Sequence, residues 1–506
     1  MRRIFKLLLF GLLALGLPGC AWQNTPTPSI SKSARAIVIT AEPKPSPTAT
    51  NAPTATRAPT RTPTATATPP PTATPTNTPT PDPYTIPRTL GGARALPRDA
   101  VLKFAPLEPL QISPAFFGLN YWVAPFGKLA RQEFAALPLT VIRWGGENFE
   151  NDKFAWSALD RFILDARLMN MEPLIQAPYS HHDPAFAAEM VRYVNLEKKY
   201  DVRLWSIGNE EDKNYRGGAK EKWINSWRGY RDAMKAVDPN ILIFGPEYSY
   251  AYDFRHPERD WLTPFLQVNG DAVDVISLHR YPFNGNQRNV TMLLRDAVGT
   301  MSRVHALQGH IRAVTGRDIP LAFTEMNLSH DWRTNGEGSS ASFTAGLWMA
   351  ETLGQMAEGG VAMVNVWSAI GDGSLSLLEA KTLSKRPTFY ALQMYAQYGD
   401  RVVPAASHVP NVKVHAARDS RTGAVTIVLV NLGKTAADFR LVLNSGGEQK
   451  DGNIYFDLNT RKRIPYTLPA HSMVSFSFDN QLARTRTLLY SRAMHDAGQP
   501  PQYTTP

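Results

Sequence analysis

Apolar and polar positions follow two different periods along the middle of the chain. Apolar runs of four to six residues, several rich in Val and Ile, are separated by longer segments in which apolar residues recur at helical spacing. Such runs predict parallel strands that are covered on both faces. The predicted strands are residues 117–122, 140–144, 173–177, 203–207, 241–244, 273–278, 320–324 and 364–367.

The segments between these runs predict amphipathic helices. Examples are residues 185–200, 220–237, 290–315 and 340–358, with start signals at Asp183-Pro184 and at Ser339. Eight strands with crossover helices over about 280 residues predict an α/β fold, a (β/α)8 TIM barrel, which we assign to residues 98–398. The first strand is not followed by a phosphate-binding glycine loop, which counts against a doubly wound sheet.

The pattern changes after Tyr398. Short alternating runs at 412–417, 425–431, 439–443, 454–457 and 473–478 are separated by turn sequences and by no segment of helix length. They predict an antiparallel β-sandwich over residues 399–481, to which residues 98–112 could add a strand. Residues 482–506 are polar and predict a loosely ordered tail.

The first twenty residues have the pattern of an export signal. Arg2, Arg3 and Lys6 precede an apolar run, 7–17, that is short for a membrane span. The run leads into Leu17-Pro18-Gly19-Cys20, which resembles a bacterial lipobox, and Cys20 is the only cysteine of the chain. We therefore expect lipid attachment at Cys20 of an exported, cell-surface or extracytoplasmic lipoprotein. The alternative is a plain signal peptide with an incidental cysteine.

Residues 21–97 are dominated by Thr, Pro, Ala and Ser. They have too little apolar bulk to offset the entropy of ordering, so they predict a disordered linker that tethers the folded part to a surface. A glycosylated stalk is a compatible alternative.

The first 99 residues carry eleven Lys and Arg against three Asp and Glu, whereas the remainder carries 43 against 41. The basic character therefore suits attachment to an anionic membrane or wall, and we expect no nucleic-acid partner.

Polar and aromatic residues follow the carboxyl ends of the predicted barrel strands. In a barrel these ends converge on one pocket. In chain order the residues are Arg143, Trp144, Tyr179, Asn209, Glu210, Glu247, His279, Tyr281, Glu325, Trp332 and Trp367.

Two of these residues suggest the chemistry. Glu210 and Glu325 each end an apolar strand, and cleavage of a glycosidic bond with retention needs two carboxyl groups about 5–5.5 Å apart. We expect Glu210 to be the acid/base, with its pKa raised by proximity, and Glu325 to be the nucleophile, kept charged by Arg143 and Tyr281. Asn209 suits a sugar hydroxyl, and Trp122, Trp144, Trp332 and Trp367 suit the faces of sugar rings.

The paired segments Ile207-Gly208-Asn209-Glu210 and Thr324-Glu325 resemble the signatures of clan A retaining glycoside hydrolases. The resemblance implies that Glu210 is the acid/base and Glu325 the nucleophile. It also matches Arg143, the pair His279 and Tyr281, and Trp367 to the clan's motifs on strands two, six and eight.

Within the clan, residues 142–146 are most similar to family forty-four, whose members are endo-acting β-1,4-glucanases and xyloglucanases built as a barrel plus a β-sandwich. The chain departs from that family's pattern at Glu147 and at Glu211.

Each candidate also has a plainer interpretation. Glu211 is more readily a partner of an arginine, Glu247 is a sugar ligand or a salt bridge, and Arg143 an ordinary ion pair. His279 could be a packed histidine. Residues 181–183, His-His-Asp, favour helix capping or a substrate contact over a metal site, because adjacent histidines point in different directions.

These observations predict a surface-tethered retaining glycosidase acting on polysaccharide, first an endo-β-1,4-glucanase or xyloglucanase, without metal or other cofactor. The alternative within the class is an exo-acting α-L-arabinofuranosidase or β-xylosidase. The alternative outside it is a non-catalytic carbohydrate-binding protein on an enzyme scaffold.

Overall fold

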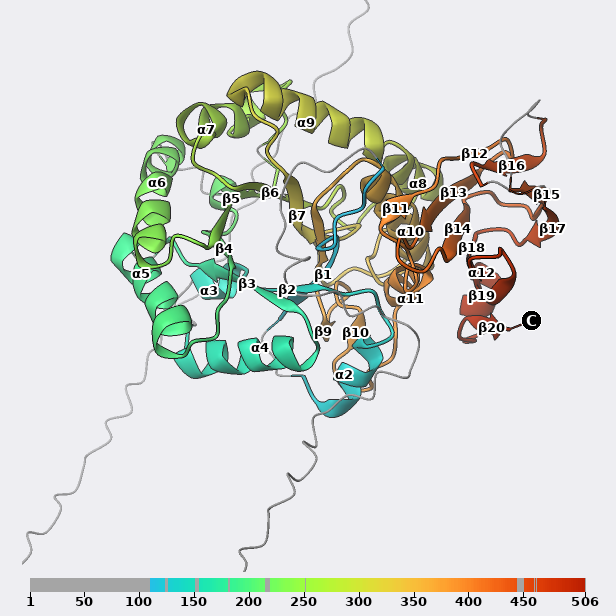
Figure 1. The fold of residues 1–506 in the computed structure, drawn as a ribbon, viewed down its shortest axis with the longest axis horizontal. Helices are drawn as coiled ribbons and strands as arrows, with labels where there is room; N and C mark the ends of the chain where they lie inside the picture. Colours follow the sequence, from blue (N-terminus) through green and yellow to red (C-terminus); the bar gives the residue numbers. More distant parts are fainter. Residues whose placement is uncertain are drawn as a thin grey trace, which may run out of the picture. The chain divides into compact units, whose positions relative to one another are not determined.

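Eight parallel strands close into a barrel in the computed structural model, and Figure 1 shows helices surrounding it. The structure describes residues 110–505 except 123–125, 151–153, 181–182, 214–218, 251, 444–449, 459 and 461. The predicted signal peptide, Cys20 and the linker lie outside these residues. Neighbouring strands follow chain order, and β1 pairs with β8: β1 Phe117–Tyr121, β2 Val141–Trp144, β3 Glu172–Ala177, β4 Leu204–Ile207, β5 Leu242–Tyr248, β6 Val275–Arg280, β7 Leu321–Met326 and β8 Met363–Val366.

The eight predicted strands are therefore confirmed, with ends that differ by a few residues. The helices include α2 Lys128–Phe134, α3 Glu147–Glu150, α4 Trp156–Leu168, α5 Pro184–Val191, α6 Ala219–Val237, α7 Leu262–Asn269, α8 Val290–Val298, α9 Thr300–Thr315, α10 Phe343–Glu358 and α11 Pro387–Met394. Asp183 caps α5 as predicted, but Ser342 rather than Ser339 caps α10. The predicted helix 290–315 is broken at Gly299 into α8 and α9.

The barrel interior changes from apolar to polar along the strands. Inward residues near the amino-terminal end form one apolar cluster: Ala115, Val141, Leu174, Leu204, Phe244, Val275, Ala322 and Met363. Alternate residues share one face of a strand, so the side chains two residues further along also point inward, and on six of these eight strands they are polar. They are Arg143, Gln176, Ser206, Ser277, Thr324 and Asn365. The sequence thus builds a packed floor below a polar upper layer.

Two sheets follow the barrel. One has the order β11-β13-β14-β18-β19-β20 and the other β12-β16-β15-β17. Neighbouring strands are antiparallel except β15 with β16, and a separate apolar cluster lies among the strands. The bounds are β11 Arg401–Val402, β12 Ala405–Ser407, β13 Val412–Arg418, β14 Val425–Asn431, β15 Ala437–Val442, β16 Asn453–Phe456, β17 Arg463–Leu468, β18 Ser472–Phe478, β19 Arg484–Ser491 and β20 Gln502–Thr504.

The prediction of a loosely ordered tail at 482–506 is wrong. This segment supplies β19, the short helix α12 Arg492–Asp496 and β20, and Leu488 and Tyr490 of β19 are buried. The prediction relied on the overall polar composition of the segment, which does not reveal that some of its residues are buried in a strand. At the start of the described chain, Leu110 and Gln111 pair with Val402 and Arg401. Only the last residues of the suggested strand 98–112 lie in the described part.

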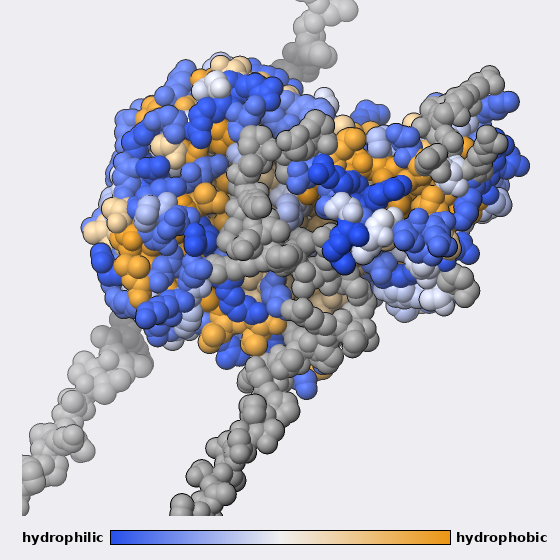
Figure 2. Space-filling view, in the orientation of Figure 1, coloured by the Kyte–Doolittle hydropathy of each residue, from blue (hydrophilic) through white to orange (hydrophobic). Residues whose placement is uncertain are grey.

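The surface of these elements is mixed in character. On the face that Figure 2 shows, hydrophilic residues cover most of the described surface and interrupt the apolar areas. Among the described residues, no helix has the length and apolar content needed to cross a bilayer.

Candidate active site

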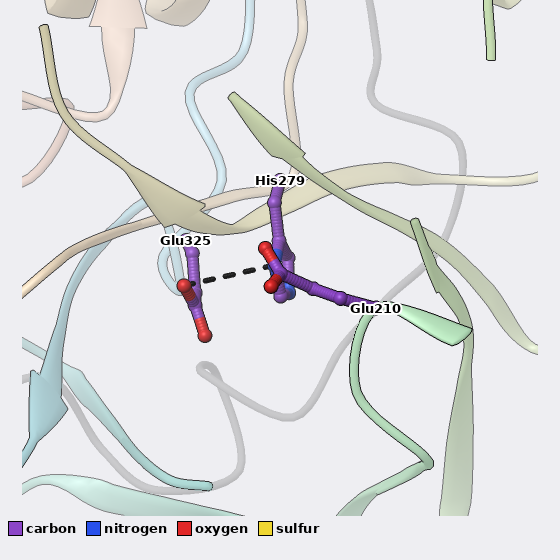
Figure 3. Close-up of side chains that lie close together, drawn as sticks. All are labelled: Glu210, His279 and Glu325. Atoms are coloured by element: carbon purple, nitrogen blue, oxygen red, sulfur yellow. Dashed lines mark hydrogen bonds and ion pairs between the residues drawn. The ribbon is translucent and has the colours of Figure 1, made fainter. Parts of the chain in front are cut away.

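Glu210, His279 and Glu325 converge at the carboxyl ends of β4, β6 and β7 (Figure 3). One carboxylate oxygen of each glutamate and one ring nitrogen of His279 lie within 4.8 Å of one another. The two acids predicted from distant parts of the chain therefore meet at one end of the barrel. This separation suits a retaining pair and is shorter than the roughly 6.5–9.5 Å of an inverting pair.

The backbone at the end of β4 turns sharply to present Glu210. Gly208 has φ +69° and Glu210 has φ +57°, a left-handed conformation that costs a non-glycine residue about 1–2 kcal/mol. A Cβ on residue 208 would lie 2.7 Å from the Trp223 ring, so glycine is required there. The Glu210 amide donates to the Glu247 carbonyl oxygen at 3.0 Å, which holds the turn.

An irregularity in β7 places Glu325. The pairing of β7 with β6 shifts register beside His279, and that with β8 shifts between Phe323 and Met326. Such a bulge turns two consecutive side chains toward one side. The Thr324 hydroxyl accordingly donates to Glu247 at 3.0 Å while Glu325 receives a hydrogen bond from Arg143 at 2.8 Å.

Both oxygens of Glu325 accept hydrogen bonds. Arg143 Nη1 donates to Oε1 at 2.8 Å, and the Tyr281 hydroxyl donates to Oε2 at 2.7 Å. These are the two donors that the sequence predicted for the nucleophile. They fix the carboxylate and stabilise its negative charge.

Arg143 is fully buried and connects the network. Its Nη2 donates at 2.8 Å to both Asn209 Oδ1 and Glu247 Oε2. Because a guanidinium only donates, the Asn209 amide oxygen must face Arg143, and the amide nitrogen is then the group that faces the pocket. Asn209 lines the pocket, so its nitrogen can donate to a sugar hydroxyl.

The expectation that the pKa of Glu210 is raised is wrong. Burial raises its pKa, but the hydrogen bond and charge of His279 and the charge of Lys213 outweigh burial and lower it to about 2. His279 Nδ1 lies 2.9 Å from Oε1, and the Lys213 ammonium contacts Oε2. Burial lowers the pKa of His279, yet the charges of Glu325 and Glu210 and the hydrogen bonds to Glu210 and Glu247 raise it to about 10.

The cavity at this end of the barrel has a volume of about 450 Å³. Of the predicted residues, it is lined by Glu210, Glu325, Asn209, Tyr281, Trp332 and Trp367, and also by Trp122. Aromatic residues thus form part of its wall, as expected for a site that binds sugar rings.

Five predicted substrate-binding residues do not line this cavity. Arg143, His279 and Glu247 are each 0 % exposed. They form a buried network in which Arg143 holds Glu325, His279 holds Glu210, and Glu247 is the salt-bridge partner of Arg143. Trp144 packs in the core against Phe149, Phe154 and Phe162, and Tyr179 points to Ser226 at 3.0 Å. Strand-end position alone did not separate side chains that point inward from those that point to the helices.

The sequence analysis also missed residues. Glu147, Lys213, His330 and Asp372 line the cavity but lie in loops and short helices that carry no strand signal. Glu211 accepts a hydrogen bond from the Ser180 hydroxyl at 3.3 Å rather than from an arginine, and burial, with the charge of Glu150, raises its pKa to about 8. Asp183 caps α5, while residues 181 and 182 lie outside the described part.

The chain is similar in sequence to two curated proteins, each named an intracellular exo-α-(1→5)-L-arabinofuranosidase. One, from Streptomyces lividans, is 27% identical over 178 residues, which are 33% of this chain and 26% of the relative. The other, from Acetivibrio thermocellus, is 22% identical over 245 residues, 38% of this chain and 47% of the relative. The chain thus matches less than half the length of either, and no protein family model matches it.

Solved structures extend the similarity to the whole fold. AbfB, a family 51 α-L-arabinofuranosidase from Bifidobacterium longum, has a TM-score of 0.57 at 14% identity and covers 73% of this chain and 97% of its own. The fold is that of the clan A glycoside hydrolases. CelM2, a bifunctional glucanase-xylanase from a metagenome library, has a TM-score of 0.55 at 16% identity, covering 72% of this chain and 96% of its own.

These similarities confirm the predicted fold class and the relation to glycoside hydrolases of clan A. They do not support the narrower resemblance to family forty-four, because the two sequence relatives are arabinofuranosidases and AbfB belongs to family 51.

Proposed function

We propose that the chain is a retaining, exo-acting α-L-arabinofuranosidase with Glu210 as acid/base and Glu325 as nucleophile. The observation that carries the proposal is the approach of the two carboxylates within 4.8 Å at the cavity floor. The choice of sugar rests on the names of the two sequence relatives. It replaces the endo-glucanase expectation with the alternative that the sequence left open.

The reaction would proceed in two displacements. Glu325 attacks the anomeric carbon and forms a glycosyl ester while Glu210 donates a proton to the departing oxygen. Glu210 then takes a proton from water, which attacks the same carbon and releases the sugar with its configuration retained. Arg143 and Tyr281 hold the nucleophile, and Asn209 binds the hydroxyl beside the reacting carbon.

A second candidate is a glucanase or xylanase. The cavity wall contains Trp122, Trp332 and Trp367, whose faces suit pyranose rings, and Trp332 is 53 % exposed at its rim. A panel of 4-nitrophenyl glycosides (α-L-arabinofuranoside, β-xyloside, β-glucoside) and of arabinan, arabinoxylan and xyloglucan would separate the candidates. We expect the arabinofuranoside to be the best glycoside, and release of single arabinose units.

The catalytic roles need their own test. Glu325→Gln is expected to lower kcat by at least about a thousandfold. Glu210→Gln is expected to slow substrates with poor leaving groups most, and azide should restore its activity on an activated aryl glycoside. Proton NMR of the first product should show retention. Full activity of both variants, or inversion, would refute the assignment, and an inactive wild type would favour the non-catalytic alternative.

We also propose that the protein is an exported lipoprotein, held at a membrane by lipid on Cys20 and reaching polysaccharide through residues 21–97. The lipobox-like sequence and the composition of the linker support this localisation. Cys20→Ser should move the enzyme from the membrane fraction to the soluble exported fraction with unchanged kcat. If wild type and variant fractionate alike, the anchor is refuted.

A further inference from the structure

A lysine contacts the carboxylate that we assign as the acid/base. The Lys213 ammonium is paired with Glu210 Oε2, and Lys213 ends the short 3-10 turn Glu211–Lys213 after β4. The Lys213 side chain is 55 % exposed, whereas that of Glu210 is 9 % exposed. Both residues line the cavity. The ammonium is therefore the more exposed member of this pair.

The other oxygen of Glu210 is engaged by a different partner. Oε1 is bonded to Nδ1 of His279 at 2.9 Å, and His279 is fully buried and held from its other side by Glu247 at 3.2 Å. Because Oε1 is already held by His279, Oε2 is the oxygen of Glu210 that remains to meet a glycosidic oxygen. Lys213 consequently occupies the position next to the leaving group.

This position creates a conflict with proton donation. An ammonium paired with Glu210 stabilises the ionised carboxylate, but a general acid must carry a proton. A neutral leaving sugar offers the ammonium no charged partner in place of Glu210. A leaving sugar that bears a carboxylate offers the ammonium a negatively charged partner equivalent to Glu210.

We propose that Lys213 is a specificity-determining residue that selects a leaving sugar bearing a carboxylate, such as a uronic acid, and that this pairing frees Glu210 to act as the acid. The inference rests on the proposed function of the site. When the substrate carboxylate takes Lys213, Oε2 of Glu210 gains a proton from solvent. That proton then passes to the glycosidic oxygen as its bond to the anomeric carbon breaks.

The charges of the site are consistent with this exchange. A bound carboxylate adds one negative charge, and protonation of Glu210 removes one, so the balance of the site is unchanged. Among the described residues, the titratable groups that act on Glu210 or Lys213 are His279, Tyr281, Glu325 and Glu147. Arg143 is hydrogen-bonded to Glu325, and Glu247 to His279. Glu147 is the rival partner, because it lines the same cavity; transfer of Lys213 to Glu147 would make the charge of the substrate irrelevant.

The test compares 3-carboxyphenyl and 3-carbamoylphenyl α-L-arabinofuranosides, which differ in charge at nearly the same shape. The ratio of kcat/KM for the two compounds is measured in wild type, Lys213→Met and Glu147→Gln. Comparing this ratio between proteins cancels the difference in leaving-group chemistry. Lys198→Met is the control, because Lys198 pairs with Asp160 outside the cavity.

We expect the ratio to be about fivefold higher in wild type than in Lys213→Met, and unchanged by Lys198→Met. The basic limb of the kcat profile should lie at higher pH for the carboxyphenyl compound in wild type only. Equal ratios in wild type and Lys213→Met, or loss of activity on both compounds in Glu147→Gln alone, would overturn the inference. If wild type hydrolyses neither compound while another glycoside is cleaved, the proposed sugar is wrong and the inference falls with it.

Discussion

At the scale of single residues, Tyr281 acts on the nucleophile through one hydrogen bond. Its hydroxyl lies 2.7 Å from Glu325 Oε2. Tyr281→Phe keeps the ring and removes the donor, so we expect kcat to fall about 10- to 100-fold, from the usual contribution of a hydrogen bond to a charged group. Steady-state kinetics with 4-nitrophenyl α-L-arabinofuranoside would measure it.

The matched control is Tyr193→Phe. The Tyr193 hydroxyl donates to Asp160 at a distance of 2.8 Å, and neither residue lines the cavity. This substitution should leave kcat unchanged. Equal losses of kcat in the two variants would show that Tyr281 contributes only to folding.

Trp144 and Trp332 separate packing from binding. Trp144 is buried among aromatic rings, whereas Trp332 is exposed at the rim of the cavity. Trp144→Ala should lower the free energy of unfolding by about 3–5 kcal/mol. Trp332→Ala should raise KM severalfold with an unchanged Tm. Denaturant unfolding and kinetics on both variants test this; a stability loss at Trp332 without a KM effect would contradict it.

At the scale of elements, helix α10 carries a glycine that β13 requires. A Cβ on Gly354 would lie 2.2 Å from the His415 ring, whereas none of the atoms around Gly309 in α9 would lie within 4 Å. Gly→Ala normally stabilises a helix interior by about 0.5–1 kcal/mol. We expect that gain for Gly309→Ala but a loss of about 1–3 kcal/mol for Gly354→Ala, because the new methyl overlaps the imidazole. Thermal unfolding should therefore give a higher Tm than wild type for Gly309→Ala and a lower Tm for Gly354→Ala.

His415 links the same helix to β13 electrostatically. Its Nε2 lies 2.9 Å from Glu351 and its Nδ1 2.8 Å from Glu358. Burial opposes protonation of His415, but the charges of Glu358 and Glu351 raise its pKa to about 10. Because the folded pKa exceeds the unfolded value near 6.5, the contribution to stability is complete below about pH 6.5 and is lost as pH rises toward 10.

His415→Gln should therefore lower Tm most at pH 6, and the difference from wild type should shrink between pH 6.5 and 10. Differential scanning fluorimetry across this range measures it. A difference in Tm that stays constant with pH would mean that His415 contributes by packing alone.

The strands were predictable because the apolar runs between 117 and 367 are similar in length and most are soon followed by polar residues. The meeting of Glu210 and Glu325 could be predicted as well, since Glu325 follows such a run directly and Glu210 follows one after two residues. Lys213 could not, because it ends a three-residue turn whose geometry depends on the left-handed conformation of Glu210. Trp144 was misplaced for a related reason: a one-residue difference in strand phase decides whether a side chain faces the cavity or the helices.

At the scale of the whole molecule, the C-terminal segment is joined to the rim of the cavity. Tyr490 of β19 packs against Phe343 of α10 and Tyr390 of α11, with ring centroids 5.2 and 4.8 Å apart. Arg492 pairs with Glu337 at 2.9 Å, in the loop between β7 and α10 that also carries Trp332. The six-stranded C-terminal sheet thus supports the barrel and one wall of the site.

Removal of residues 482–506 therefore separates two views of this segment. A loosely ordered tail could be deleted without effect. Loss of β19, in contrast, exposes the edge of β18 and removes the aromatic contacts of Tyr490 with α10 and α11. We expect truncation to lower Tm by more than about 5 °C. Arg492→Met should keep Tm within about 2 °C of wild type, because the ion pair is partly exposed, but should raise KM by freeing the Trp332 loop. A truncated enzyme with wild-type Tm and KM would show that the barrel does not depend on β19. An unchanged KM in Arg492→Met would show that the segment contributes to stability alone.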